Sequence, residues 1–177
     1  MNTAKRPFDV IGQLAALRRY ARSLARNGDD AEDLVHDALV RAYENRASYK
    51  GGSSLRGWLL SILHNAHIDR LRQSKSRAVR HQQAHLDSEP QLAANQEHAV
   101  RLAQVRTAFF ALPEDQREAL HLVAIEDLSY QEAADTLAIP IGTLMSRVSR
   151  ARERLRNFEN KPPGSHLKLI GGADDDA

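Results

Sequence analysis

The 177-residue sequence contains no cysteine and no long apolar run, and each absence excludes a class of protein. Without cysteine there is no disulfide framework, no thiolate zinc site and no cysteine nucleophile. No segment approaches the ~20 consecutive apolar residues that a membrane-spanning helix needs. The N-terminus also lacks the unbroken apolar core of a signal peptide. We therefore expect a cytoplasmic protein that does not insert into a membrane.

The sequence also lacks the usual signatures of an active site. Gly51-Gly52 does not have the neighbouring residues of a phosphate-binding loop, and no Ser/His/acid arrangement stands out. His64 and His67 are one helical turn apart with Asp69 nearby, but a convincing third metal ligand is missing. The prediction is a protein that is not an enzyme and has no metal and no cofactor.

No strand pattern occurs anywhere in the sequence, so we expect an all-α fold. The length allows one domain or two small ones, and each small domain would be only marginally stable alone. A polar, Gln-rich stretch without periodicity separates two helical segments and is interpreted as a flexible linker. The expected organisation is a three-helix domain at 8–77, a linker at 78–97, a four-helix domain at 98–157 and a disordered tail at 158–177.

Apolar residues at helical spacing define the N-terminal half. A first helix is expected over 8–26, with Asn27-Gly28 ending it, and a second is expected to begin at Asp30. Ser54 is positioned to cap a third helix. The second helix has a predicted buried stripe of Leu34, Val35, Ala38, Leu39 and Ala42.

The C-terminal half contains the pattern of a helix-turn-helix. Ser129 and Glu132 have the spacing of a capping box at the start of a short helix, and Pro140 cannot continue that helix. The next helix has an apolar stripe opposite small hydroxyl residues and arginines. Two short helices with apolar faces around a tight turn are typical of this motif. The stripe is predicted to contain Leu144, Val148, Ala151 and Leu155.

The basic face of that last helix has two interpretations. It is either a solvated surface or a face that binds DNA. Formal net charge is only +2, so the basicity is local. Small hydroxyl residues at the start of the helix, flanked by arginines, favour DNA binding, because the start of a recognition helix meets base edges while arginines hold phosphates.

Two stretches together resemble the extracytoplasmic-function subfamily of bacterial sigma-70 factors. They are DAEDLVHDALVRAYENRASYKGGSSLRGWLLSILHNAHIDRLR (30–72) and LPEDQREALHLVAIEDLSYQEAADTLAIPIGTLMSRVSRARERL (112–155), in the family's order and with a linker between them. Ordinary helix-turn-helix regulators lack the first stretch, so the pair is more specific than either alone.

The resemblance implies a role for each part of the N-terminal half. The helix over 30–41 would dock on the clamp helices of the polymerase beta-prime subunit, through Asp33, His36, Asp37 and Arg41. The loop over 49–54 and the helix through Asn65 would read the minus-ten element as single-stranded DNA.

Two side chains have the chemistry that reading a single strand needs. Tyr49 offers a stacking face, and Asn65 offers both a donor and an acceptor. The alternatives are a Tyr49 ring folded onto the core and a solvated Asn65, and Trp58 is expected in the core. The residues implied for this element are Tyr49, Lys50, Arg56, Asn65, Arg70 and Arg72.

The resemblance assigns the minus-thirty-five element to the last helix. Its implied contacts are Thr143, Ser146, Arg147 and Arg150. The sequence departs from the family at Met145, where a basic residue is frequent, and at Ser149, where bulkier residues occur. Both departures bear on promoter preference, and they predict fewer phosphate anchors on that flank.

The resulting hypothesis is a sigma factor that directs core RNA polymerase to promoters and helps to melt them. Its implied partners are core polymerase (the beta-prime clamp helices and the beta flap), promoter DNA and an anti-sigma factor, in a stress or signal response. Two alternatives stay open. One is a stand-alone helix-turn-helix regulator of duplex DNA, and the other is an interaction adaptor that has lost DNA binding.

Overall fold

The computed structural model describes residues 8–25, 27–50, 54–78 and 96–159, and within these ranges the chain is helical without any strand. The expected all-α class is therefore confirmed. Most of the expected linker (78–97) and tail (158–177) lies outside the described residues. No helix in the described ranges is long and apolar enough to cross a bilayer. The α-helices are α1 (Leu14–Leu24), α2 (Gly28–Glu44), α3 (Leu55–Ala78), α4 (Gln96–Phe110), α5 (Glu114–Ala124), α6 (Tyr130–Leu137) and α7 (Ile141–Glu159).

The start of α2 differs from the sequence prediction. Asn27 does not end the first helix, because α1 stops at Leu24. Asn27 is instead the N-cap of α2, since its side-chain oxygen accepts a hydrogen bond from the Asp30 backbone N–H at 2.7 Å. A capping asparagine satisfies one of the orphan donors of a helix start, so α2 begins at Gly28, two residues earlier than predicted.

The three helices of the N-terminal half, α1 to α3, pack around one set of apolar side chains. The predicted stripe of α2 is confirmed, with four of its five residues buried and Leu39 half-buried. Ser54 caps α3 as expected, accepting from the Gly57 N–H at 3.2 Å. Two ion pairs join α2 to α3 at its edge, Arg41 with Asp69 at 2.7 Å and Arg70 with Asp37.

The helix-turn-helix of the C-terminal half is confirmed in detail. Ser129 and Glu132 form both hydrogen bonds of the capping box at the start of α6. Ala138 ends α6 in the left-handed conformation at φ 52°, and Pro140 precedes α7. Three of the four predicted stripe residues of α7 are fully buried and Leu155 is half-buried.

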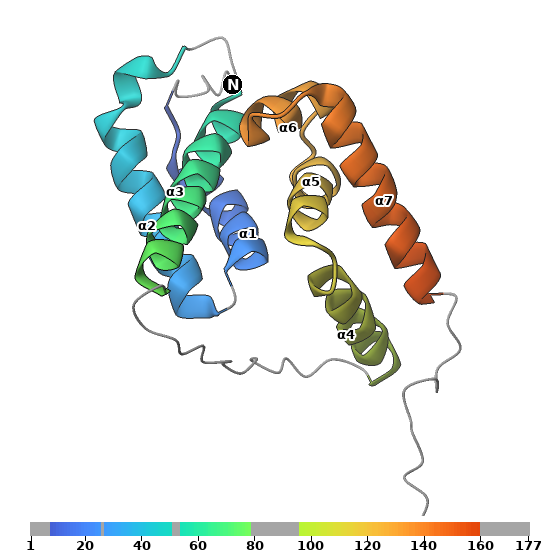
Figure 1. Cartoon of the computed structure of the whole chain (residues 1–177). Coiled ribbons are helices and arrows are strands. Elements are labelled where there is room, and N and C mark those ends of the chain that lie inside the picture. Colours follow the sequence, from blue (N-terminus) through green and yellow to red (C-terminus); the bar gives the residue numbers. More distant parts are fainter. Residues whose placement is uncertain (1–7, 26, 51–53, 79–95, 160–177) are drawn as a thin grey trace, which may run out of the picture.

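The two halves pack directly against each other, which the sequence did not predict. α1 faces α5, and α3 meets α6 near its N-terminal end (Figure 1). Buried apolar side chains from both halves form one continuous core. This packing is called the closed arrangement below.

A buried carboxylate is at the centre of the contact between the halves. Glu126, in the turn after α5, has a side chain with 0% exposure. Arg19 on α1 binds both of its oxygens, through Nε at 2.9 Å and Nη2 at 2.8 Å. His121 Nε2 lies 3.4 Å from the same carboxylate. Although burial opposes ionisation, these two neighbours hold the pKa of Glu126 below its ordinary value.

Further polar contacts cross the same boundary. Arg117 Nε on α5 donates to the Ser23 carbonyl at 2.8 Å, and Arg56 Nη1 on α3 donates to the Glu126 carbonyl at 3.2 Å. The fully buried Tyr20 ring lies 5.3 Å from the His121 ring. These contacts fix the register between the halves, because each donor must meet one particular acceptor.

We predict that Arg19→Ala opens the closed arrangement. The substitution leaves the Glu126 carboxylate buried without its bidentate partner, and this costs about 1–3 kcal/mol, less if the carboxylate becomes hydrated. Exposing Glu126 by separating the halves relieves this cost. Small-angle X-ray scattering should therefore show a larger radius of gyration than for the unsubstituted protein.

Arg18→Ala is the matched control. Arg18 is a neighbouring arginine of α1 whose partner, Glu32 at 3.1 Å, lies within the same half. Its radius of gyration should stay unchanged. Equal expansion of both variants, or expansion of neither, would contradict the role given to the Arg19–Glu126 pair.

Candidate nucleic-acid interface and the contact between the halves

The recognition helix α7 shows an exposed polar face, as the sequence predicted. Ser146, Ser149 and Arg150 are exposed, while Thr143 is half-buried. The Ser146 hydroxyl donates to the Thr143 carbonyl at 3.0 Å, and this bond holds it against its own helix. This face is available to a DNA groove without any change in α7 itself.

Arg147 is the exception among the four residues predicted on α7. Its Nε lies 3.4 Å from Asp115 on α5, and its side chain is 26% exposed. In the closed arrangement it is therefore turned toward α5. Arg147 would have to leave Asp115 to contact DNA, and an ion pair with this exposure is weak enough to exchange.

Tyr49 takes the alternative conformation considered from the sequence. The ring is half-buried and packs with Phe8 at 6.0 Å and Trp58 at 5.4 Å between centroids. Trp58 packs against the core, as predicted. Three aromatic rings therefore gather beside the start of α3, where the predicted single-strand contact was expected.

The other residues predicted for the minus-ten element fall into two groups. Lys50, Asn65 and Arg72 are exposed. Arg56 and Arg70 are less exposed and bind protein groups. Arg56 donates to Gln13 and to the Glu126 carbonyl, and Arg70 Nε donates to Asp37 at 3.0 Å. Opening the closed arrangement would release Arg56 from Glu126, whereas the Arg70 pair lies wholly within the N-terminal half.

The face of α2 predicted to meet the polymerase is only partly free of internal contacts. Asp33 and His36 are exposed. Asp37 and Arg41 are half-buried and form the two ion pairs with α3 described above. Asp33 and His36 therefore face solvent, whereas Asp37 and Arg41 also hold α2 against α3.

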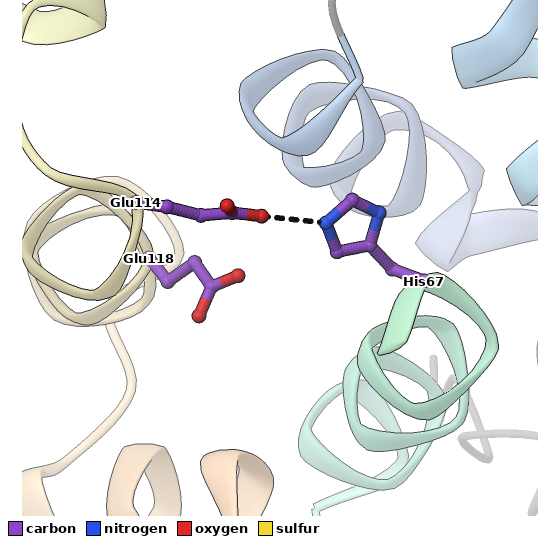
Figure 2. A group of neighbouring side chains, drawn as sticks. All are labelled: His67, Glu114 and Glu118. Carbon is purple, nitrogen blue, oxygen red and sulfur yellow. Dashed lines mark hydrogen bonds and ion pairs between the residues drawn. The ribbon is translucent and has the colours of Figure 1, made fainter. Parts of the chain in front are cut away.

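A group of titratable side chains lies between the halves and was not predicted from the sequence. Glu114 and Glu118, one turn apart on α5, face His67 on α3 (Figure 2). His67 Nε2 lies 2.8 Å from Glu114 Oε1. His64 Nδ1 lies 4.0 Å from Glu118 Oε2 and 3.3 Å from the Tyr20 hydroxyl. The sequence separates these partners by 44 to 54 positions, so no local pattern indicates that they meet.

Burial controls the protonation of this group. It lowers the pKa of His64 to about 4, so the ring is neutral at pH 7. Burial and then the Glu114 charge raise the pKa of Glu118 to about 7. Burial also raises the pKa of Tyr20 well above 10, so its phenol keeps its proton while it hydrogen-bonds to the neutral His64 ring. Near neutral pH the Glu118 carboxyl is therefore partly protonated.

We predict that Glu118→Gln stabilises the protein increasingly as pH rises from 5 to 8. A carboxyl whose folded pKa is raised from 4.5 to about 7 contributes stability below pH 4.5, and this is lost as pH rises through 7. The glutamine cannot ionise and keeps that stability, worth at least about 1 kcal/mol at pH 8 because one pKa unit is about 1.4 kcal/mol. Chemical denaturation at both pH values measures the difference, and a variant less stable than the parent at pH 8 would contradict it.

Comparison with known families agrees with this division into halves. Residues 13–77 match the model of sigma-70 region 2, and residues 102–155 match that of sigma-70 region 4. The chain is 36% identical over 170 residues to the ECF RNA polymerase sigma factor EcfG of Rhodopseudomonas palustris, covering 94% of this chain and 87% of that one. It is 33% identical over 139 residues to the sigma factor SigM of Mycobacterium tuberculosis, covering 78% and 69%.

Solved structures show the same relationship. The sigma factor RpoE of Bartonella quintana, solved with the anti-sigma factor NepR, has a TM-score of 0.73 and 36% identity, covering 85% of this chain and 94% of that one. CnrH, solved with the cytosolic domain of CnrY, has a TM-score of 0.60 and 28% identity, covering 85% and 84%. The chain belongs to the extracytoplasmic-function (ECF) family of RNA polymerase sigma factors.

Proposed function

We propose that this protein is a promoter-specificity subunit, which binds core RNA polymerase and directs it to particular promoters. The observation that carries the proposal is the presence of a region 2 half and a region 4 half, in that order, in one chain. The protein acts in the cytoplasm as a binding protein, without catalytic chemistry of its own and without a cofactor. Its partners are the beta-prime clamp helices, the beta flap and promoter DNA.

The recognition helix α7 reads the minus-thirty-five element as duplex DNA. Its exposed Ser146 and Arg150 face the bases, and the half-buried Thr143 borders them. Arg147 joins them once it leaves Asp115. Short hydroxyls allow the helix to approach the groove closely, and a guanidinium can bind guanine through two hydrogen bonds. Arg152 donates to the Tyr130 hydroxyl at 3.4 Å, so this second arginine also orients α6 against α7.

The start of α3 captures the minus-ten element as a single strand. A base that leaves the stack can be read on its Watson–Crick edge by the amide of Asn65 and stacked on an aromatic ring such as Tyr49. Lys50 and Arg72 follow the phosphates from exposed positions, and Arg56 and Arg70 lie alongside. Binding energy from the captured strand drives the melting.

The polymerase binds the exposed face of α2. Asp33 and His36 supply the outer contacts, and Asp37 and Arg41 supply the contacts nearest α3. The positive end of the helix carries Asp29 and Asp30 in its first turn, so the contact face is acidic at its start. A basic surface on the clamp helices is the complementary partner.

The closed arrangement has to open for both elements to be read together. Helices α3 and α7 both contact α5, through the His67–Glu114 and Arg147–Asp115 pairs. At about 8–10 Å for each helix-to-helix step, the axes of α3 and α7 are roughly 16–20 Å apart. About 25 base pairs separate the two elements, or ~85 Å of duplex at 3.4 Å per base pair. The closed form is therefore an inactive one.

A protein partner that stabilises the inactive form would regulate the chain. The similar structures of RpoE and CnrH are complexes with anti-sigma factors. Control by an anti-sigma factor in a stress or signal response is therefore part of the proposal. Co-purification of the native protein with polymerase alone, from unstressed cells, would contradict it.

Reconstituted transcription tests the proposed function. Purified protein and core RNA polymerase are mixed with a genomic fragment library, and the RNA start sites are sequenced. The proposal predicts discrete new start sites that share two upstream elements. No initiation, together with specific duplex binding by the protein alone, would favour a stand-alone regulator instead.

Two substitutions should separate the two DNA contacts. Arg150→Ala should weaken binding to a duplex minus-thirty-five probe by about 1–3 kcal/mol, because a bidentate base contact is lost. Asn65→Ala should leave that binding unchanged and reduce melting, measured by permanganate reactivity at the minus-ten element. An equal loss for Arg150→Ala on every duplex sequence would show a phosphate contact in place of a base contact.

A further inference from the structure

The side chains between the halves include a set with the chemistry of a metal site. One donor atom each from His67, Glu114 and Glu118 lies within 4.8 Å of the other two. His67 comes from α3, and the two glutamates come from successive turns of α5, so all three point into the same space (Figure 2). The sequence offered a histidine pair without a third ligand, and the packing of the halves provides two carboxylates.

Glu118 is the least satisfied member of this set. Its side chain is 7% exposed, and within the described part of the chain it forms no hydrogen bond. Its one polar contact is His64 Nδ1 at 4.0 Å. A buried carboxylate without a partner is costly, and proteins resolve this cost by protonation, by pairing or by a bound cation.

The nearby arginines attract the Glu118 charge but form their direct contacts elsewhere. The Arg117 Nε donates to the Ser23 carbonyl, and Arg147 pairs with Asp115. Asp69, the acid nearest the histidine pair in sequence, is paired with Arg41. His67, Glu114 and Glu118 are thus left as a group of two carboxylates and one imidazole without a direct contact to an arginine or lysine among the described residues.

We propose that His67, Glu114 and Glu118 form a binding site for a divalent transition-metal ion, with Zn²⁺ the best match, and that the ion holds the two halves in the closed arrangement. One imidazole nitrogen and two carboxylate oxygens are ligands that Zn²⁺ binds at about 2.0–2.2 Å, and a water molecule can complete four-coordination. Glu114 exchanges its hydrogen bond to His67 for the ion. His64 stays outside the ligand set because Tyr20 occupies its Nδ1.

The site exists only while the halves are together, so metal binding and closure are linked. A ligand that binds one of two states shifts the equilibrium toward that state in proportion to its concentration over Kd. The metal would thus oppose opening. The regulatory consequence rests on the proposed sigma function, whereas metal binding and closure do not.

The first test measures binding by the full-length protein alone. After treatment with a chelator and its removal, Zn²⁺ is titrated by calorimetry and its effect on thermal unfolding is recorded, with Mg²⁺ as the comparison ion. The expected result is one Zn²⁺ per chain, a higher Tm with Zn²⁺ and no change with Mg²⁺. Absence of a Zn²⁺-dependent Tm increase would overturn the proposal.

Variants locate the ion. Glu118→Gln and His67→Gln should each lower Zn²⁺ affinity at least tenfold, while the exposed Glu153→Gln on α7 should leave it unchanged. Glu118→Gln is expected to be well folded without metal, so loss of its Zn²⁺ response cannot be attributed to unfolding. Unchanged affinity in both Glu118→Gln and His67→Gln would mean that the ion binds elsewhere and would overturn the site.

The bridging role has its own test in the Arg19→Ala protein, whose halves are expected to separate. Zn²⁺ should return its radius of gyration in small-angle scattering to the closed value, and should fail to do so when Glu118→Gln is added. Zn²⁺ binding without closure would overturn the bridging role. None of these measurements involves polymerase, so failure of the proposed function would appear separately, in reconstituted transcription.

Discussion

The buried Glu126 carboxylate is the constraint on which the closed arrangement depends. It has no access to water, and the guanidinium that compensates it belongs to the other half of the chain. The Arg19 side chain is 46% exposed, so the pair is only half buried. Desolvation of the carboxylate offsets much of the attraction, but removing Arg19 leaves a buried charge without its partner and is costly. Its effect is therefore specificity: the halves must meet with Arg19 facing Glu126. The same placement of the halves brings the Tyr20 ring against His121 and the Arg117 guanidinium against the Ser23 carbonyl.

The contact between the halves engages some proposed DNA-binding residues in the closed form and frees them when the halves separate. This contact contains both polar groups and apolar side chains of the shared core. Opening it lets DNA, polymerase or water replace the polar partners, but it also exposes apolar surface, and that exposure favours the closed form. Arg56 and Arg147 illustrate the exchange, since each binds a protein oxygen in the closed form and each is a proposed DNA contact once released. The exposed polar face of α7 needs no such release.

Much of each half was predictable from the sequence because its signals are local. The capping box at Ser129, the stripe of α7 and the buried face of α2 depend on residues within two or three turns. Asn27 was misassigned because an asparagine can end one helix or cap the next, and only backbone geometry decides. The contact between the halves was not predictable. Arg19 and Glu126 are 107 positions apart, and no periodicity indicates that a carboxylate will be buried against this particular arginine.

The separation of the two halves is the most direct test of this account. Because the chain has no cysteine, Glu44→Cys on α2 and Glu153→Cys on α7 introduce two unique labelling positions, both exposed. Spin labels at these positions report the distance between the halves by pulsed electron paramagnetic resonance. We expect a single narrow distance distribution for the protein alone and a different, longer distance in a complex with core polymerase and promoter DNA. An unchanged distance in a transcriptionally active complex would contradict it.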